Sequence, residues 1–399
     1  MRAVTWQGPK NMSVEEVPDP VIQDPTDAII KVTTTGLCGS DLHLYEPLSA
    51  FMTAGDVVGH EPMGIVQEVG SGITNLKAGD RVVVPFNVSC GDCWMCNQGL
   101  MSQCETTQNH EHGTGASLLG YSKLYGQVPG GQAEYLRVPF AGFSAIKVPE
   151  GPVDDRYVYL SDVLPTAWQA VEYAGFGADS SAEGRTLLVM GAGPIGDMAT
   201  RIALERGARV IVVDLVPERL ARVSARGAEV INLEEVGKGL GDAVRSLTDG
   251  RGADAVIDAV GMEAHGSPII EMTHKMVSMM PSAIAQPFMK KAGIDRLAAL
   301  YAAFDTVRRG GTVSISGVYG GSMDPIPMMQ LFDKQVQIRM GQANVRRWSD
   351  DILAVLSQDE DVYGVESFAT HHLSLDDAPQ AYADFREKKN GMVKVLFQP

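Results

Sequence analysis

Apolar and amphipathic stretches alternate through the second half of the chain. Short apolar runs that predict strands lie at residues 185–190, 209–214, 253–260, 310–317 and 335–341. Longer stretches between them predict helices, including one at residues 295–310. Regular alternation of strands with helices is typical of a parallel, doubly wound sheet. This half of the chain therefore predicts an α/β domain.

The first half of the chain has a different pattern. Strand-like runs follow one another with glycine turns between them, which favours a β-rich domain. The last residues, 391–399, read GMVKVLFQP and predict a strand that returns to this β-rich part. We therefore expect the first domain to be discontinuous, with the α/β domain inserted into it.

Composition and charge narrow the classes of function. The 399 residues are 45% hydrophobic, and no apolar run approaches the roughly 18 residues that would span a bilayer. The 33 basic and 49 acidic residues give a net charge of −16, which disfavours binding to nucleic acid or anionic lipid. A small-molecule partner is favoured, although the same acidity also suits a surface that only needs to stay soluble. Residues 1–20 do not resemble a secretory signal, so we expect a cytoplasmic protein without membrane contact.

Four of the five cysteines lie within fifteen residues, as Cys90, Cys93, Cys96 and Cys104. Sparse cysteines in a reduced compartment argue against disulfides, and the spacing departs from that of ferredoxin clusters. Four thiolates at short spacing suit tetrahedral Zn²⁺, and they leave no open position for substrate. We therefore predict a structural zinc site, which contributes on the order of 10 kcal/mol to local folding. A redox sensor or a chance cluster is the alternative.

The fifth cysteine, Cys38, lies in GLCGSDLH, and a second stretch rich in metal ligands, GHEPMG, holds His60. A catalytic zinc site takes three protein ligands and keeps a fourth position open. Cys38 and His60 supply two of them, and the third is a His, Asp or Glu that spacing alone does not identify. The alternatives are a buried thiol and a core histidine.

A glycine motif marks the start of the α/β domain. Gly191, Gly193 and Gly196 stand between a predicted strand and a predicted helix, and Asp214 ends the next strand. This context is strong evidence for dinucleotide binding, because glycines let the backbone approach the pyrophosphate and the acidic residue binds the ribose hydroxyls. Asp214 would repel a 2′-phosphate, which favours NAD over NADP.

Three charged residues near the glycine motif bear on the prediction that this domain binds NAD. Arg219 and Arg222 follow Asp214 closely, and an arginine there can serve a 2′-phosphate; solvated helix charges are the other reading. Asp197 stands directly after the third glycine, and we expect its carboxylate to point away from the pyrophosphate.

Together these motifs resemble those of the zinc-containing medium-chain alcohol dehydrogenases. The resemblance runs through GLCGSDLH, GHEPMGIVQEVGSGI, the four-cysteine lobe, GGQAEYLRVP and the glycine motif. It places Asp162, in YLSDVLPTAWQA, at the position of the third zinc ligand, although an aspartate there also suits a helix cap. That aspartate, VPFNVSCGDC, SDVLPT, AVGMEAHG and an insertion near residues 262–300 resemble the glutathione-independent formaldehyde dehydrogenase branch.

The resemblance implies a fold and a domain division. It predicts a GroES-like, β-rich catalytic domain at residues 1–162 and 342–399 and an NAD-binding Rossmann domain at residues 163–341. The substrate cleft would lie between the two domains. The methionine-rich insertion is either a lid or ordinary helix packing. Homologous cofactor domains commonly pair, so a homo-oligomer, dimer or tetramer, is expected.

The resemblance also assigns roles to individual residues. Ser40 would pass the substrate proton through the cofactor ribose to His43, which is expected to titrate near neutrality. Asp41 and Glu61 would orient His60 and tune the metal. The expected cofactor contacts are Thr166, Gly191, Gly193, Pro194, Ile195, Gly196, Asp214, Arg219, Val260, Gly317 and Val318.

The predicted activity is hydride transfer between NAD and a small alcohol or aldehyde, with two zinc ions per chain. Two alternatives remain open. An aldehyde dismutase would keep NAD bound through turnover, and a zinc- and nucleotide-binding sensor would lack catalysis.

Overall fold

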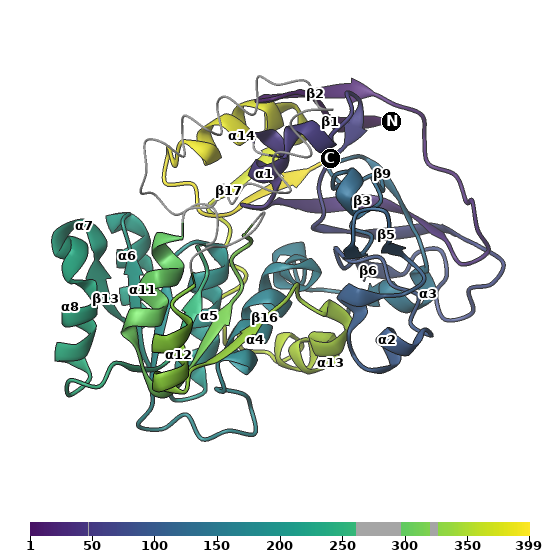
Figure 1. Ribbon diagram of the computed structural model, residues 1–399. Helices are drawn as coiled ribbons and strands as arrows, with labels where there is room; N and C mark the ends of the chain where they lie inside the picture. The colour runs from purple at the N-terminus through teal and green to yellow at the C-terminus, as the bar shows by residue number, and fades with distance from the viewer. Residues whose placement is uncertain (47, 261–296, 320–325) are drawn as a thin grey trace. The chain divides into compact units, whose positions relative to one another are not determined.

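The computed structural model describes residues 1–46, 48–260, 297–319 and 326–399 (Figure 1). It divides into two compact units, unit 1 with residues Met1–Pro165 and Ala343–Pro399, and unit 2 with residues Thr166–Gln342. Most of the insertion that we predicted near residues 262–300 lies outside the described residues. No helix in the described part of the chain is long and apolar enough to cross a membrane.

Unit 1 is built mainly from strands. Its larger sheet has the order β10-β6-β5-β3-β18-β17, with β9 also paired to β3, and a smaller sheet has the order β2-β1-β4. The strands are β1 (Arg2–Gly8), β2 (Asn11–Glu16), β3 (Ala28–Leu37), β4 (Asp56–Val57), β5 (Pro62–Val69), β6 (Arg81–Val83), β9 (Tyr135–Val138), β10 (Ile146–Lys147), β17 (His371–Ser374) and β18 (Val395–Gln398). The helices used below are α1 (Asp41–Tyr45), α2 (Trp94–Asn97), α13 (Val345–Leu356) and α14 (Ala378–Arg386).

The C-terminal strand joins the large sheet of unit 1, as its sequence predicts. β18 pairs antiparallel with β3, with Val395 opposite Leu37, and parallel with β17. The β-branched residues Ile30, Val32 and Val66 of β3 and β5 are buried with Val82 and Leu136 in one core cluster. Such residues fit a pleated, buried surface, which explains why these runs form strands.

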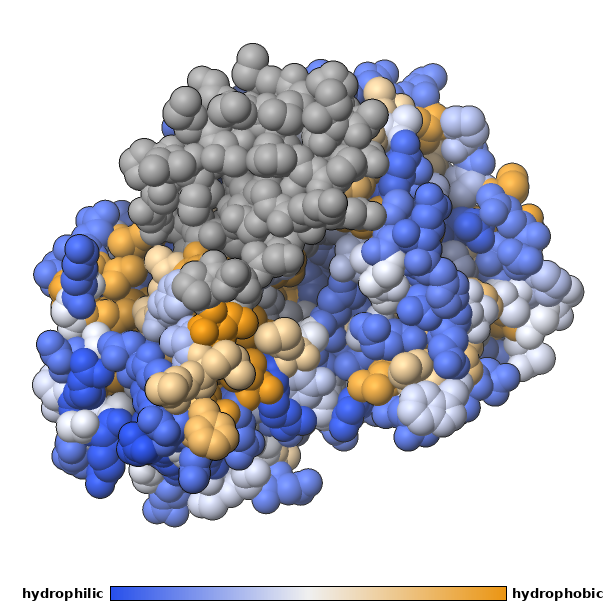
Figure 2. All heavy atoms as spheres, in the orientation of Figure 1, coloured by the Kyte–Doolittle hydropathy of each residue, from blue (hydrophilic) through white to orange (hydrophobic). Residues whose placement is uncertain are grey.

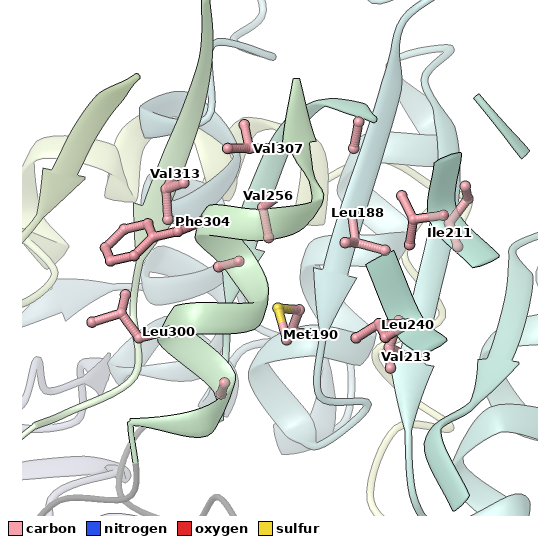
Figure 3. Packing of buried hydrophobic residues seen from close by; sticks show 14 of the residues in the cluster. Leu188, Met190, Ile211, Val213, Leu240, Val256, Leu300, Phe304, Val307 and Val313 are labelled. Carbon is pink, nitrogen blue, oxygen red and sulfur yellow. The ribbon is translucent and has the colours of Figure 1, made fainter. Parts of the chain in front are cut away.

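Unit 2 contains the predicted parallel sheet. Its six strands follow the order β13-β12-β11-β14-β15-β16, and every neighbouring pair is parallel. The strands are β11 (Thr186–Met190), β12 (Arg209–Asp214), β13 (Glu229–Asn232), β14 (Ala253–Asp258), β15 (Val307–Ile315) and β16 (Gln337–Met340). The helices are α4 (Val163–Tyr173), which begins in unit 1, α5 (Pro194–Glu205), α6 (Pro217–Ser224), α8 (Leu240–Leu247), α11 (Ala298–Thr306) and α12 (Met328–Lys334). Figure 3 shows Leu300 and Phe304 of α11 in one buried cluster with Leu188, Val256 and Val313 of the sheet.

The boundary between α11 and β15 differs from the prediction. The helix that we expected at residues 295–310 ends at Thr306, and β15 begins at Val307. Val307 pairs with Ala253 of β14, so a partner distant in sequence decides the conformation there. Sheet pairing of this kind overrides the local helical pattern.

Candidate functional site

Four side chains with metal-binding atoms converge in unit 1. Cys38 follows β3, His60 and Glu61 precede β5, and Asp162 lies just before α4. Cys38 is half-buried, the other three are buried, and the ligand atoms of all four lie within 4.8 Å of one another. Oδ2 of Asp162 is 3.4 Å from Sγ of Cys38 and 3.4 Å from Nε2 of His60. The structure thus brings together the three ligands expected for a catalytic zinc.

The spacing of these atoms fits one zinc ion. Tetrahedral bonds of about 2.0–2.3 Å to nitrogen, oxygen and sulfur place neighbouring donor atoms about 3.3–3.8 Å apart. Both 3.4 Å distances from Asp162 fall in that range. A thiolate, an imidazole and a carboxylate together also balance the charge of a divalent ion while leaving a fourth position.

The electrostatics of the cluster favour a bound cation. Desolvation, together with the nearby charge of Asp162, raises the pKa of Cys38 to about 11. The thiol therefore keeps its proton at neutral pH unless a cation stabilises the thiolate. Metal binding at this position has to release that proton.

Asp41 contacts the backbone or side chain of two of the ligands. Its Oδ1 lies 3.0 Å from Nδ1 of His60, and its Oδ2 accepts a hydrogen bond of 3.0 Å from the backbone N–H of Cys38. Because Nδ1 faces Asp41, Nε2 of His60 is turned toward Asp162 and the centre of the cluster. A carboxylate behind a metal-binding histidine fixes the ring and raises its basicity.

Glu61 has a different partner from the one we expected. Its Oε2 pairs with the ammonium of Lys394, and its Oε1 has no hydrogen-bond partner among the described residues. Burial lowers the pKa of Lys394, but the charges of Glu61, Cys38 and Asp162 and the hydrogen bond to Glu61 together outweigh burial, and the net shift is upward. Asp41, and not Glu61, faces Nδ1 of His60. Sequence reasoning missed Lys394, although a single lysine within the apolar run GMVKVLF was the available signal.

The two residues of the expected proton route lie at the start of α1. Oγ of Ser40 is 3.3 Å from Nε2 of His60, so the hydroxyl stands beside the metal-binding nitrogen. His43 is buried, and its backbone N–H donates to the carbonyl of Ser40. Burial lowers the pKa of His43 to about 4, against the charge of Asp41, which acts to raise it. The near-neutral titration that we expected of His43 is therefore wrong, and the ring is neutral at pH 7.

The four clustered cysteines also gather around one point. The Sγ atoms of Cys90, Cys93, Cys96 and Cys104 lie within 4.8 Å of one another, with 3.9 Å between Cys93 and Cys104. Tetrahedral bonds of about 2.3 Å place sulfurs about 3.8 Å apart. Burial raises the pKa of Cys93, but backbone N–H groups of Cys96 and Glu105 lower it more, and the net shift is downward. The spacing of the four sulfurs therefore fits the structural zinc site that the sequence predicts.

The lobe is anchored to the segment where the chain returns to unit 1. The backbone N–H and the hydroxyl of Ser102 both donate to Oδ1 of Asn344, at 3.0 and 2.9 Å. The side-chain amide of Asn87 donates to the carbonyl of Ala343 at 2.9 Å. These buried bonds connect the lobe to the start of α13.

The glycine motif of unit 2 connects β11 to α5. A Cβ added to Gly196 would lie 1.8 Å from the carbonyl oxygen of Gly191, so helix and strand approach too closely for any side chain. Gly191 has a φ of +91°, and a Cβ there would lie 2.9 Å from Val260. Pro194 begins α5 at the first helical position, where its missing N–H costs nothing. The helix N-terminus is left free to face an anion.

Asp214 contacts the glycine motif directly. Its Oδ2 accepts from the backbone N–H of Ala192 at 2.6 Å. Its Oδ1 accepts from the backbone N–H groups of Leu215 and Val216. The guanidinium of Arg219 also lies close to the glycine motif, since its Nη1 would be 3.8 Å from a Cβ added to Gly193.

Asp197 and Arg222 form an ion pair. The fully buried carboxylate of Asp197 accepts from Nε of Arg201 at 2.7 Å and from Nε of Arg222 at 2.5 Å. The interpretation of Arg222 as a solvated helix charge was wrong, since its guanidinium is half-buried against α5.

The remaining cofactor candidates lie at the carboxyl ends of β14 and β15 or on helices. The backbone N–H groups of Val260 and Gly317 both bond to Asp258, while Val318 is exposed. Ile195 lies in the first turn of α5, and Thr166 lies in α4. In parallel sheets, ligands bind at this edge.

Comparison with known proteins agrees with this geometry. Family models for the alcohol dehydrogenase GroES-like domain and for zinc-binding dehydrogenases match residues 24–150 and 194–286. The zinc-type alcohol dehydrogenase-like protein AdhB of Bacillus subtilis is 40% identical over 403 residues, covering 100% of both chains. A glutathione-independent formaldehyde dehydrogenase of Pseudomonas aeruginosa is 32% identical, covering 96% of this chain and 94% of its own. Alcohol dehydrogenase TADH from Thermus sp. ATN1 has a TM-score of 0.81 and 33% identity, covering 100% of this chain and 99% of that structure.

Proposed function

Because the chain belongs to the zinc-type medium-chain alcohol dehydrogenases, we propose that it transfers hydride between NAD and small primary alcohols or aldehydes, formaldehyde included. The family match supports a zinc-type dehydrogenase, and the nicotinamide cofactor is part of the proposal. The observation that carries the proposal is the cluster of Cys38, His60 and Asp162, whose donor atoms fit one zinc ion, while Glu61, the fourth member of the cluster, is paired with Lys394.

The residues around this cluster have defined roles in the proposed reaction. A zinc ion held there supplies Lewis acidity, which lowers the pKa of an alcohol and polarises an aldehyde. Asp41 orients His60 and the Cys38 backbone. Ser40 would take the hydroxyl proton of the substrate and give up its own proton toward His43. His43 would relay this proton onward and not keep it, because its pKa is lowered to about 4 and its ring is neutral at pH 7. A second zinc ion in the four-cysteine lobe has a structural role.

The proposed cofactor is NAD. Asp214 ends β12 beside the glycine motif, so its carboxylate favours ribose hydroxyls and repels a 2′-phosphate. The ion pair between Arg222 and Asp197 further supports NAD. It engages the guanidinium of Arg222, which would otherwise be available to bind a 2′-phosphate.

We also propose a homo-oligomer formed through unit 2. β16 is an edge strand of the six-stranded sheet, and exposed apolar side chains cover it and α12 (Figure 2). The members of this set, the β16–α12 patch, are Ile326, Met328, Met329, Phe332, Ile338 and Met340. Exposed apolar patches beside a free strand edge are typical of subunit contacts.

The test is a panel of small alcohols and aldehydes, including formaldehyde without glutathione, followed by the absorbance of NADH. We expect reduction of NAD that is lost in Cys38→Ser and kept in His110→Ala, a change at an exposed residue. Equal amounts of alcohol and acid from an aldehyde, with no free NADH, would instead indicate dismutation with retained cofactor. Binding of zinc and nucleotide without any turnover would indicate a sensor and contradict the proposal.

A further inference from the structure

Lys394 is a fully buried ammonium group next to the metal ligands. Its Nζ donates to the carbonyl of Leu37 at 3.1 Å and to Oε2 of Glu61. Leu37 immediately precedes Cys38, and Glu61 immediately follows His60. The side chain of Lys394, the residue just before β18, therefore connects the two segments that supply the thiolate and the imidazole.

The chain makes room for this ion pair. Glu61 and Lys394 are both fully buried, and a Cβ on Gly36 would lie 2.0 Å from Oε2 of Glu61 and 3.0 Å from Nζ of Lys394. Only glycine fits at position 36 in this arrangement. Removing two charges from water is costly, and apolar replacements of such pairs are often equally stable. The ion pair is therefore better explained by a role at the site than by stability.

Without Lys394, Glu61 would be a competing ligand. A carboxylate oxygen of Glu61 lies within 4.8 Å of the ligand atoms of Cys38, His60 and Asp162. Zinc accepts a carboxylate as readily as it accepts water, and a fourth protein ligand would give the closed coordination of a structural site. Pairing with the ammonium neutralises Glu61 and fixes its Oε2 by a charge-assisted hydrogen bond.

We propose that Lys394 is a positioning residue that holds Glu61 off the metal and so keeps the fourth coordination position open. It acts through Glu61 and does not touch substrate. This inference rests on the metal site of the proposed function and adds a residue that controls its coordination number.

The test replaces the metal by Co²⁺ and reads the visible spectrum, which reports coordination, during titration with imidazole as an external ligand. In Lys394→Gln, we expect a changed spectrum and imidazole binding weaker by at least about tenfold, the scale of losses around metal ligands. The double variant Lys394→Gln/Glu61→Gln is expected to regain the wild-type spectrum and imidazole affinity. Lys389→Gln, at an exposed lysine, is the matched control. A Lys394→Gln protein with an unchanged spectrum and unchanged imidazole affinity would overturn the proposal.

A second comparison does not depend on the folding of Lys394→Gln. Wild type and Glu61→Gln should bind imidazole with affinities that agree within a few-fold, because Glu61 is already held away. Imidazole binding by Glu61→Gln but not by wild type would show that Glu61 closes the site, and would overturn the proposal. Both measurements are made without turnover, so an intact cobalt spectrum in an enzyme that oxidises no alcohol would contradict the proposed function alone.

Discussion

Cys38 shows at the scale of one residue how the site depends on a metal ion. Desolvation and the charge of Asp162 together raise the pKa of its thiol to about 11. Since the thiolate is the form that binds zinc, the free energy of zinc binding includes the release of a proton. The affinity for zinc must then fall as the pH falls, because protons compete for the sulfur throughout the range below the raised pKa.

We expect zinc binding at pH 7 to release about one proton from Cys38, so that this residue alone costs about tenfold in affinity per pH unit of acidification. Calorimetric titration of metal-free protein in two buffers with different ionisation enthalpies measures the proton count. Cys38→Ser, which leaves the four-cysteine lobe unchanged, should release about one proton fewer than wild type. An equal count in the two proteins would show that the thiol is already ionised and would refute the raised pKa.

Individual site residues differed in how far the sequence could predict them. Cys38 and His60 stand out because they lie in short stretches rich in metal ligands. Asp162 is 124 residues from Cys38, so only a family resemblance, and not spacing, could select it. Lys394, just before β18, was missed because one polar residue in an apolar run does not show which group it pairs with. These pairings depend on tertiary contacts.

At the scale of elements, the junction of β11 and α5 is determined by a single missing side chain. The carbonyl of Gly191 fills the space that a Cβ on Gly196 would occupy, and a distance of 1.8 Å leaves no room for adjustment. The same close approach places the N-terminus of α5 at the carboxyl edge of the sheet. The close approach at Gly196 therefore determines both how α5 packs on β11 and where the phosphate-binding turn lies.

Gly196→Ala should destabilise unit 2 by about 1–3 kcal/mol, because the added methyl group forces α5 away from β11. We also expect weaker nucleotide binding, since the turn between them moves. Denaturant unfolding and titration with NADH by fluorescence measure the two effects. Gly239→Ala is the matched control, because no atom lies within 4 Å of its added Cβ. If Gly196→Ala has the same stability and the same affinity for NADH as the control, the close contact between Gly196 and the carbonyl of Gly191 would be refuted.

The order of elements was predictable, but their ends were less so. Apolar runs of strand length between helical stretches predicted the parallel sheet of unit 2, and its family match confirms the Rossmann-like domain. The GroES-like domain is confirmed in the same way. The helix before β15 ended four residues earlier than expected, at Thr306 instead of residue 310, because Val307 enters the sheet. The local hydrophobic pattern therefore predicts whether a segment is a helix or a strand, and pairing with the neighbouring strand determines where the segment ends.

At the scale of the whole molecule, the distribution of apolar surface contrasts with the charge of the chain. A net charge of −16 opposes association between copies of the chain. The β16–α12 patch is nevertheless apolar, with Phe332 and Met329 exposed by 83% and 81%. An open strand edge adds unpaired backbone groups to the same surface. Two copies related by a twofold axis would bury this surface on both chains at once.

We therefore expect the wild-type protein to sediment as a dimer or tetramer, and the double variant Phe332→Glu/Ile338→Glu to sediment as a single chain. Charges placed in an apolar contact remain buried without partners, which costs several kcal/mol and exceeds what the remaining surface can recover. Analytical ultracentrifugation gives the masses, and Val21→Glu, at an apolar residue of unit 1 that is 63% exposed, controls for the added charge. A wild-type protein that already sediments as one chain would show that the patch serves another purpose. An oligomer that survives the double substitution would place the subunit contact elsewhere.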